Sequence, residues 1–191
     1  MKTKSLVGPD YAAFLTEVKG RIVSARLHAA RAVNRDLILL YWDIGRGIVE
    51  RQETLGWGKS VVEMLSRDLQ QAFPQMRGFS VRNLWYVRRL YAEYTEPLIL
   101  QQVAAELARK QSDMGRKADA LARLQQLAAE IPWGHHMLLM DRIPDAKARL
   151  YYLRATAQLG WSRNVLLNQI KAGAYERAVT EKIDVGEEVA A

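Results

Sequence analysis

Two basic segments of the sequence each carry side chains suited to contacting nucleic acid. In the first, Arg82, Tyr86 and Arg89 recur at helical spacing, so they share one stripe of a predicted helix. The two arginines are about 10 Å apart along the axis. Because a guanidinium group binds phosphate through two parallel hydrogen bonds, we predict that this stripe contacts a phosphate backbone. An ordinary solvated helix face is the alternative.

The second set of side chains lies just after Ser162. Asn164, Asn168 and Lys171 form a polar stripe, and Arg163 lies beside it. Asparagine can pair with adenine through two hydrogen bonds, and lysine contacts phosphate or guanine. The stripe is therefore a candidate for base reading, although asparagine is also an ordinary residue of helix surfaces.

Each set lies in a helix that a glycine–aromatic–serine tripeptide opens. The chain holds three glycine–aromatic–small turns: Gly56-Trp57-Gly58, Gly78-Phe79-Ser80 and Gly160-Trp161-Ser162. The glycine allows a tight backbone, the aromatic ring fills the core, and serine caps the next helix. Such a turn between helices builds a helix-turn-helix unit, and it also serves as a plain structural corner.

The elements that must position these residues are all predicted to be helices. The first helix covers 10–33 and continues over 35–50, with a bend near Asn34 and an end that Gly45 and Gly47 weaken. No alternation typical of strands accompanies turn residues, so the fold class is all-α, with two helix-turn-helix-like units and a long N-terminal helix. The later helices are expected at 59–72, 80–94, 98–130, 135–140, 145–158 and 162–173. The range 98–130 forms one helix or two, with a weak point at Gly115.

This pattern divides the chain into four ranges. We expect N-terminal helices with the first helix-turn-helix-like unit over 10–96 and an Ala/Gln-rich helical connector, a spacer or an arm, over 97–131. The second helix-turn-helix-like unit covers 132–177, and a frayed tail covers 178–191.

Composition and charge narrow the classes of function. The 191 residues carry a formal net charge of +7 and no cysteine, which excludes disulfides and thiolate zinc sites and favours an anionic partner. The longest apolar run, 37–42, is far shorter than the roughly 18 residues of a membrane span. A cytoplasmic protein without a membrane segment is the simplest interpretation.

No constellation of residues predicts catalysis, a metal site or a cofactor. His135 and His136 are adjacent, so their rings cannot share one helix face, and Ser80 and Ser162 are helix caps rather than nucleophiles. Pro9-Asp10 with Glu17-X-Lys19 imitates a metal-dependent nuclease signature. Glu17 and Lys19, however, point about 200° apart on a predicted helix, so we reject that interpretation.

Arg88 differs from the neighbouring arginines because it falls inside the apolar arc of its helix. A buried arginine must be paired. We expect an ion pair with Asp68 or Glu63 of the preceding helix, and the alternative is that this arc faces a second subunit.

The ordered motifs also carry a family resemblance. AARAVNRDLILLYWDIGRGI, GWGKSVVEMLSRDLQQAFPQMRGFSVRNLWYVRRLYAEY, IPWGHHMLLM and GWSRNVLLNQI resemble the N-terminal domain of the YhcG-type proteins over about residues 15–177. In that family an α-helical domain precedes a PD-(D/E)XK nuclease-like domain. The resemblance implies a role in handling DNA, including defence against foreign DNA, with a nuclease domain as partner in cis or in trans.

Two functions follow as hypotheses. The first is a non-catalytic DNA-binding module that positions a separate nuclease domain. The alternative is an oligomerisation or protein-docking module without direct contact to nucleic acid. A homodimer or homo-oligomer is compatible with both, because paired helix-turn-helix units commonly bind DNA as dimers.

Overall fold

Helices are the regular secondary structure in the parts of the chain that the structure describes, and turns and short loops join them. This computed structural model describes residues 9–108 and 116–180, and Gly115 and most of the expected frayed tail lie outside these ranges. Residues 174–180 add a helical segment after the last labelled helix. The helices are α1 (Pro9–Leu55), α2 (Lys59–Ala72), α3 (Val81–Tyr94), α4 (Pro97–Ala108), α5 (Arg116–Ala129), α6 (Trp133–Arg142), α7 (Ala146–Leu159) and α8 (Arg163–Lys171).

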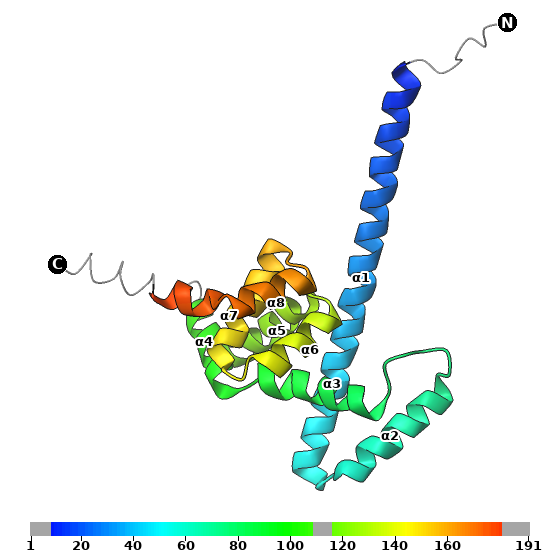
Figure 1. Ribbon diagram of the computed structural model, residues 1–191. Helices are drawn as coiled ribbons and strands as arrows, with labels where there is room; N and C mark the ends of the chain where they lie inside the picture. Colours follow the sequence, from blue (N-terminus) through cyan, green and yellow to red (C-terminus); the bar gives the residue numbers. More distant parts are fainter. Residues whose placement is uncertain (1–8, 109–115, 181–191) are drawn as a thin grey trace, which may run out of the picture.

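The long first helix, α1, is continuous over 47 residues. It runs through Asn34, where a bend was expected, as one uninterrupted helix. The Asn34 side chain there donates from Nδ2 to the carbonyl of Ile131, at 3.2 Å. The N-terminal half of α1 projects beyond the other helices, and the C-terminal half packs into them (Figure 1). None of the helices described is both long and apolar enough to cross a bilayer.

Gly45 explains how α1 can approach α3 closely. It is buried within the helix, and a Cβ atom built there would overlap the carbonyl oxygen of Val87 and lie 3.1 Å from Cβ of Tyr91. Glycine was expected to weaken the helix here. Its missing side chain instead creates the space in which the two backbones meet.

One hydrophobic cluster joins α1, α3 and the helices after them. Its largest buried side chains include Trp42, Tyr94 and Tyr152. The expected connector contributes to this same cluster, because Ile99 of α4 and Leu124 of α5 are almost fully buried in it. A small second cluster seats α2: Ile48, Val62, Phe79 and Leu84.

The three glycine–aromatic turns have the geometry that their sequences predict. Gly56, Gly78 and Gly160 all have positive φ angles, which glycine adopts without steric cost. The hydroxyls of Ser80 and Ser162 accept hydrogen bonds from the third residue of α3 and of α8, both at 3.3 Å. Both serines are therefore N-caps, as predicted.

Arg88 does not form the expected ion pair. Neither Asp68 nor Glu63 is bonded to it; its Nε donates to the side-chain oxygen of Gln52 in α1. Its guanidinium also lies 6.0 Å from the ring centre of Trp85. The ion-pair expectation was wrong because α1, rather than α2, packs against this side of α3.

Among the aspartate, glutamate, lysine and arginine side chains that the structure describes, the buried one is that of Arg149 in α7, which is 3% exposed. Its guanidinium lies 3.2 Å from the Glu93 carboxylate. It also donates to the carbonyl oxygens of Ile143, Pro144 and Glu93. A buried arginine is tolerated when it is paired and hydrogen-bonded, and through these contacts Arg149 ties α3 to α7.

Candidate nucleic-acid interface

The N-termini of α3 and α6 lie side by side. The ring N–H of Trp133, the first residue of α6, donates to Oδ1 of Asn83 at 2.8 Å. Asn83 in turn donates from Nδ2 to the carbonyl of Gly78 at 2.6 Å. The turn that launches α3 is thereby fixed to the first turn of α6.

The N-terminus of α8 meets the same turn of α6. Nε2 of His135 lies 3.0 Å from the carbonyl oxygen of Trp161, to which it donates because a carbonyl can only accept. Nε of Arg163 donates to the carbonyl of Gly134 at 3.4 Å. The turns that open α3 and α8 are therefore joined through the start of α6, and three helix N-termini converge.

This convergence has an electrostatic consequence. The N-terminus of a helix carries a partial positive charge and backbone N–H groups without a partner inside the helix. Arg82 and Arg163 are exposed beside two of these ends, and the described residues include no acidic partner for either. This end of the domain is therefore suited to an anion such as a phosphate group.

The first predicted stripe is brought together by the fold, but most of it is occupied by internal contacts. The guanidinium groups of Arg82 and Arg89 lie 5.9 and 5.4 Å from the ring centre of Tyr86. The Tyr86 hydroxyl donates to the Asp141 carboxylate at 2.8 Å. Arg89 pairs with Asp141 at 3.1 Å and with Glu93 at 2.7 Å.

Its contacts with Asp141 change the role expected of Arg89 in this stripe. Arg89 also donates to the carbonyl of Met140 at 2.6 Å, so its guanidinium joins α3 to the end of α6. Arg82 is the member of the stripe that stays exposed. The sequence offered no signal for this contact, because Asp141 lies 52 residues beyond Arg89.

The second predicted stripe faces solvent along α8. All four of its members are exposed, while Leu166 on the other side of the helix is buried in the core. Its polar groups are therefore available to an external partner. These exposed residues are Arg163, Asn164, Asn168 and Lys171.

The adjacent histidines, His135 and His136, both make hydrogen bonds to other residues of the protein. Nε2 of His136 donates to the carbonyl of Ala128 at 2.9 Å, and its Nδ1 accepts from the Tyr94 hydroxyl at 3.1 Å. Burial lowers the pKa of His136 to about 4 and also lowers the pKa of His135. In the ranges described, no group of three histidine, aspartate or glutamate side chains is placed to hold a metal ion.

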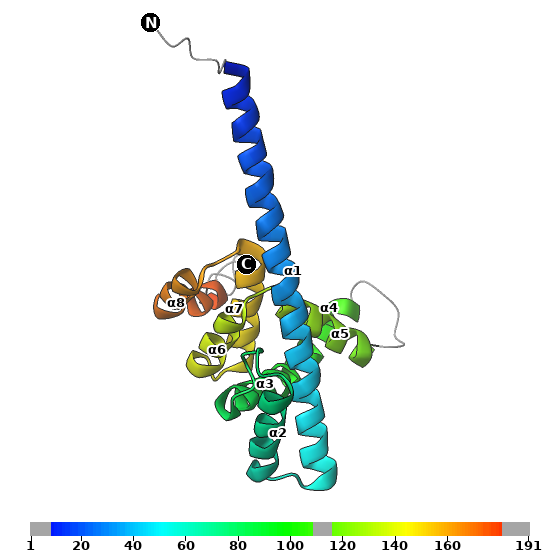
Figure 2. The same cartoon turned by 90° about the vertical axis from the view of Figure 1, so that its right-hand side faces the viewer.

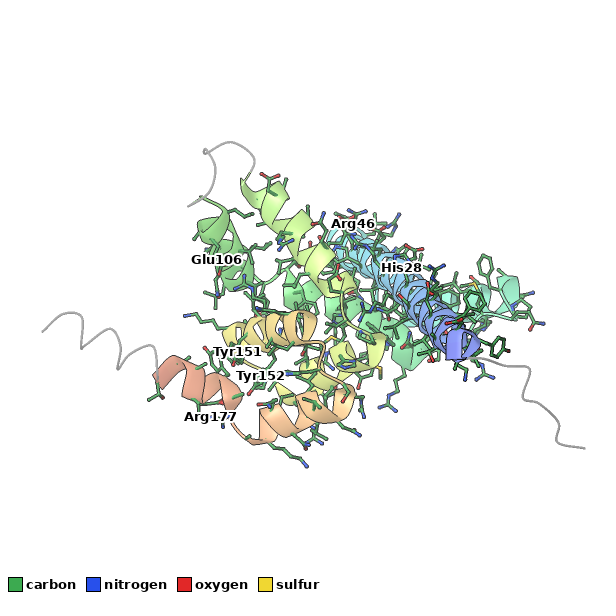
Figure 3. The ribbon with its side chains drawn as sticks, turned by 90° about the horizontal axis from the view of Figure 1, so that it is seen from above. His28, Arg46, Glu106, Tyr151, Tyr152 and Arg177 are labelled. Carbon is green, nitrogen blue, oxygen red and sulfur yellow. The ribbon has the colours of Figure 1, made fainter. Side chains whose placement is uncertain are left out.

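A surface depression of about 450 Å³ lies between α4, α5 and α7. Arg154 closes one side of it through two hydrogen bonds to Glu106, at 2.6 and 2.9 Å. Figure 3 shows Glu106 on α4, across from Tyr151 on α7. Because Arg154 and Glu106 are paired with each other, neither of them serves as an activated acid, base or nucleophile in this depression.

Comparison with known proteins places these features in a family. Residues 17–177 match the family described as DUF1016 N-terminal domain. The chain is also 30% identical, over 165 residues, to a protein of Escherichia coli (strain K12) named "Putative nuclease YhcG". The alignment covers 82% of this chain and 43% of that relative, so the chain spans less than half of the relative's length. No solved structure matches the chain.

Proposed function

Because this chain belongs to the DUF1016 N-terminal domain family, we propose that it is a DNA-binding module without a catalytic site of its own. In this proposal it acts in the cytoplasm and positions a nuclease domain, in cis or in trans, on DNA. The name of the E. coli relative, which contains the word nuclease, supports the association with nucleic acid. The same name says nothing of how DNA is held.

The observation that carries the proposal is the convergence of the N-termini of α3, α6 and α8. Three positive helix ends, with Arg82 and Arg163 exposed beside them, offer a phosphate backbone several donors on one end of the domain. Arg89 is assigned a positioning role, because its donors are used by Asp141, Glu93 and Met140. The exposed stripe of α8 extends the interface toward the bases.

Within this interface, phosphate contacts and base contacts have different roles. Arg82, Arg163 and Lys171 hold the phosphate backbone, which fixes position without reading sequence. Asn164 and Asn168 are the members that can pair with base edges, because an amide group both donates and accepts. Tyr86 supports Arg82 through its ring, and its hydroxyl is directed to Asp141.

The test is a binding titration of the full chain with labelled duplex DNA over a series of salt concentrations, read by fluorescence anisotropy. Arg82→Ala/Arg163→Ala should weaken binding to all sequences alike and reduce the salt slope by about 2, because each lost phosphate contact removes about one unit. Single-stranded DNA and RNA of the same sequence are measured in parallel.

The matched control removes two positive charges elsewhere. Lys117 and Arg123 lie on α5, which is on the other side of α1 from α8 in the view of Figure 2. Lys117→Ala/Arg123→Ala should leave the salt slope close to that of the unaltered protein. Equal losses of affinity in the two double variants would show that net charge, rather than this interface, governs binding. Unchanged binding in Arg82→Ala/Arg163→Ala would show that DNA does not contact this interface.

A further inference from the structure

The N-terminal half of α1 projects past the other helices (Figures 1 and 2), and large apolar side chains along it are exposed in the described structure. Phe14 is 61% exposed and Ile22 is 52% exposed, and Tyr11, Leu15 and Val33 are exposed as well. Helices in proteins gain most of their stability by packing an apolar face against another element. The exposed face is therefore suited to packing against another molecule.

The apolar side chains form a regular seam along this half of the helix. The seam consists of Leu15, Val18, Ile22, Ala25 and Ala29, which alternate steps of three and four residues. This is the spacing of a helix that pairs with another helix in a coiled coil. The seam extends about 21 Å from its first to its last residue.

The seam faces away from the body of the protein. Ile38, on the same helix, is fully buried in the core, and at 100° per residue Ile22 lies about 160° around the axis from it. A helix laid along the seam would therefore not collide with the protein's own core. Figure 3 shows this part of α1, marked by His28, set apart from α7, marked by Tyr151.

Both edges of the seam are basic. Lys19 and Arg26 lie along one edge, and Arg21 and His28 lie along the other. Between Val18 and Arg35 the sequence contains no acidic residue. Glu17 pairs with Arg21 at 2.6 Å, but both side chains are more than half exposed, so this pair contributes little.

We infer that the seam docks an amphipathic helix of a partner protein whose apolar stripe is bordered by acidic side chains. Such a helix satisfies both features of the face: it covers the apolar residues, and its carboxylates meet the cations at the positions that set partner choice in coiled coils. A nucleic acid would satisfy the cations and leave Leu15 and Ile22 in water.

A second copy of this chain fits less well than an acidic helix. In a parallel pair, Arg21 of one copy would face Arg26 of the other. In an antiparallel pair centred on Ile22, Lys19 of one copy would face Arg26 of the other. Like charges at these flanking positions oppose association, so the charge pattern favours a different, acidic chain.

The experiment uses the full chain and two synthetic four-heptad peptides with leucine at the two core positions of each heptad. One peptide carries glutamate at the flanking positions and the other carries lysine. The chain should bind the glutamate peptide at least about tenfold more tightly than the lysine peptide, measured by anisotropy of labelled peptide. Lys19→Glu/Arg26→Glu should reverse this preference.

A matched pair of variants tests the seam itself. Ile22→Glu should weaken binding of the glutamate peptide about tenfold or more, because it places a charge in the apolar contact. Leu27→Glu adds the same charge at a residue of similar exposure, 54%, on the side of the helix away from the seam. It should therefore change binding less than about twofold. Circular dichroism verifies that both variants keep their helices.

Several results would overturn the inference. The glutamate peptide could fail to bind, or Ile22→Glu and Leu27→Glu could have the same effect. Sedimentation could show that the unaltered chain is a dimer that Ile22→Glu converts to a monomer, which would make a second copy the occupant. Loss of duplex-DNA binding in Lys19→Glu/Arg26→Glu, with neither peptide bound by the unaltered chain, would assign the face to nucleic acid.

Discussion

The contact between α1 and α3 at Gly45 gives a prediction whose sign is opposite to the general rule. Replacing glycine by alanine inside a helix normally stabilises it by about 0.5–1 kcal/mol. At Gly45 the added Cβ would overlap the Val87 carbonyl oxygen and lie 3.2 Å from the carbonyl carbon. Both are backbone atoms, so the clash cannot be relieved by rotating a side chain.

Relief therefore requires the two helices to move apart. Overpacking of this kind costs about 1–3 kcal/mol, which exceeds the gain in helix propensity. We expect Gly45→Ala to lower the free energy of unfolding by about 1–2 kcal/mol after this gain is subtracted. The thermal midpoint should fall by about 2–4 °C for each kcal/mol in a chain of this size. Urea denaturation followed by circular dichroism measures the change.

Gly20 provides the control within the same helix. It lies in the projecting half, and a Cβ atom built there has no neighbour within 4 Å. Gly20→Ala should therefore increase helix content and leave the unfolding midpoint of the body unchanged or slightly raised. If Gly45→Ala proved as stable as the unaltered protein, or more stable, the argument that α1 and α3 are in backbone contact would be refuted.

Two further predictions concern buried polar groups. Arg149→Ala should destabilise the fold by about 3–5 kcal/mol in urea denaturation, because it leaves the carbonyl oxygens of Ile143 and Pro144 without their donor and Glu93 with Arg89 as its remaining partner. Arg149→Met, which keeps the packing, should cost less. His136 has a pKa lowered from 6.5 to about 4, so the unfolded chain takes up a proton between these values that the folded chain does not. The free energy of unfolding should therefore fall as the pH is lowered from about 6.5 to 4, by roughly 3 kcal/mol in total. His136→Gln should flatten this part of the pH profile, and an unchanged profile would contradict the assignment.

Much of the fold could be predicted from the sequence because its signals are local. The serine caps at Ser80 and Ser162, the positive-φ glycines and the all-α class follow from residues within a few positions of each other. The family resemblance was likewise carried by ordered motifs, and the match over residues 17–177 confirms it. Helix ends and caps depend on neighbouring backbone groups, so tertiary contacts are not needed to recognise them.

The roles of individual arginines could not be predicted in this way. Arg82 and Arg89 are equivalent on a helical wheel, but Asp141 and Met140 of α6 bind Arg89 and leave Arg82 exposed. Arg88 was expected to find an acid and instead donates to Gln52. Each outcome depends on a residue more than 30 positions away, which only helix packing brings near.

The sequence by itself determined which helices form, where the tight turns lie and that the chain is basic. Only the tertiary structure decided that the turns before α3 and α8 meet at Trp133 and Gly134. It also decided that the first half of α1 remains uncovered while the second half is buried. The physical reason is that periodicity shows which face of a helix is apolar, whereas the partner that covers this face is set by contacts distant in sequence.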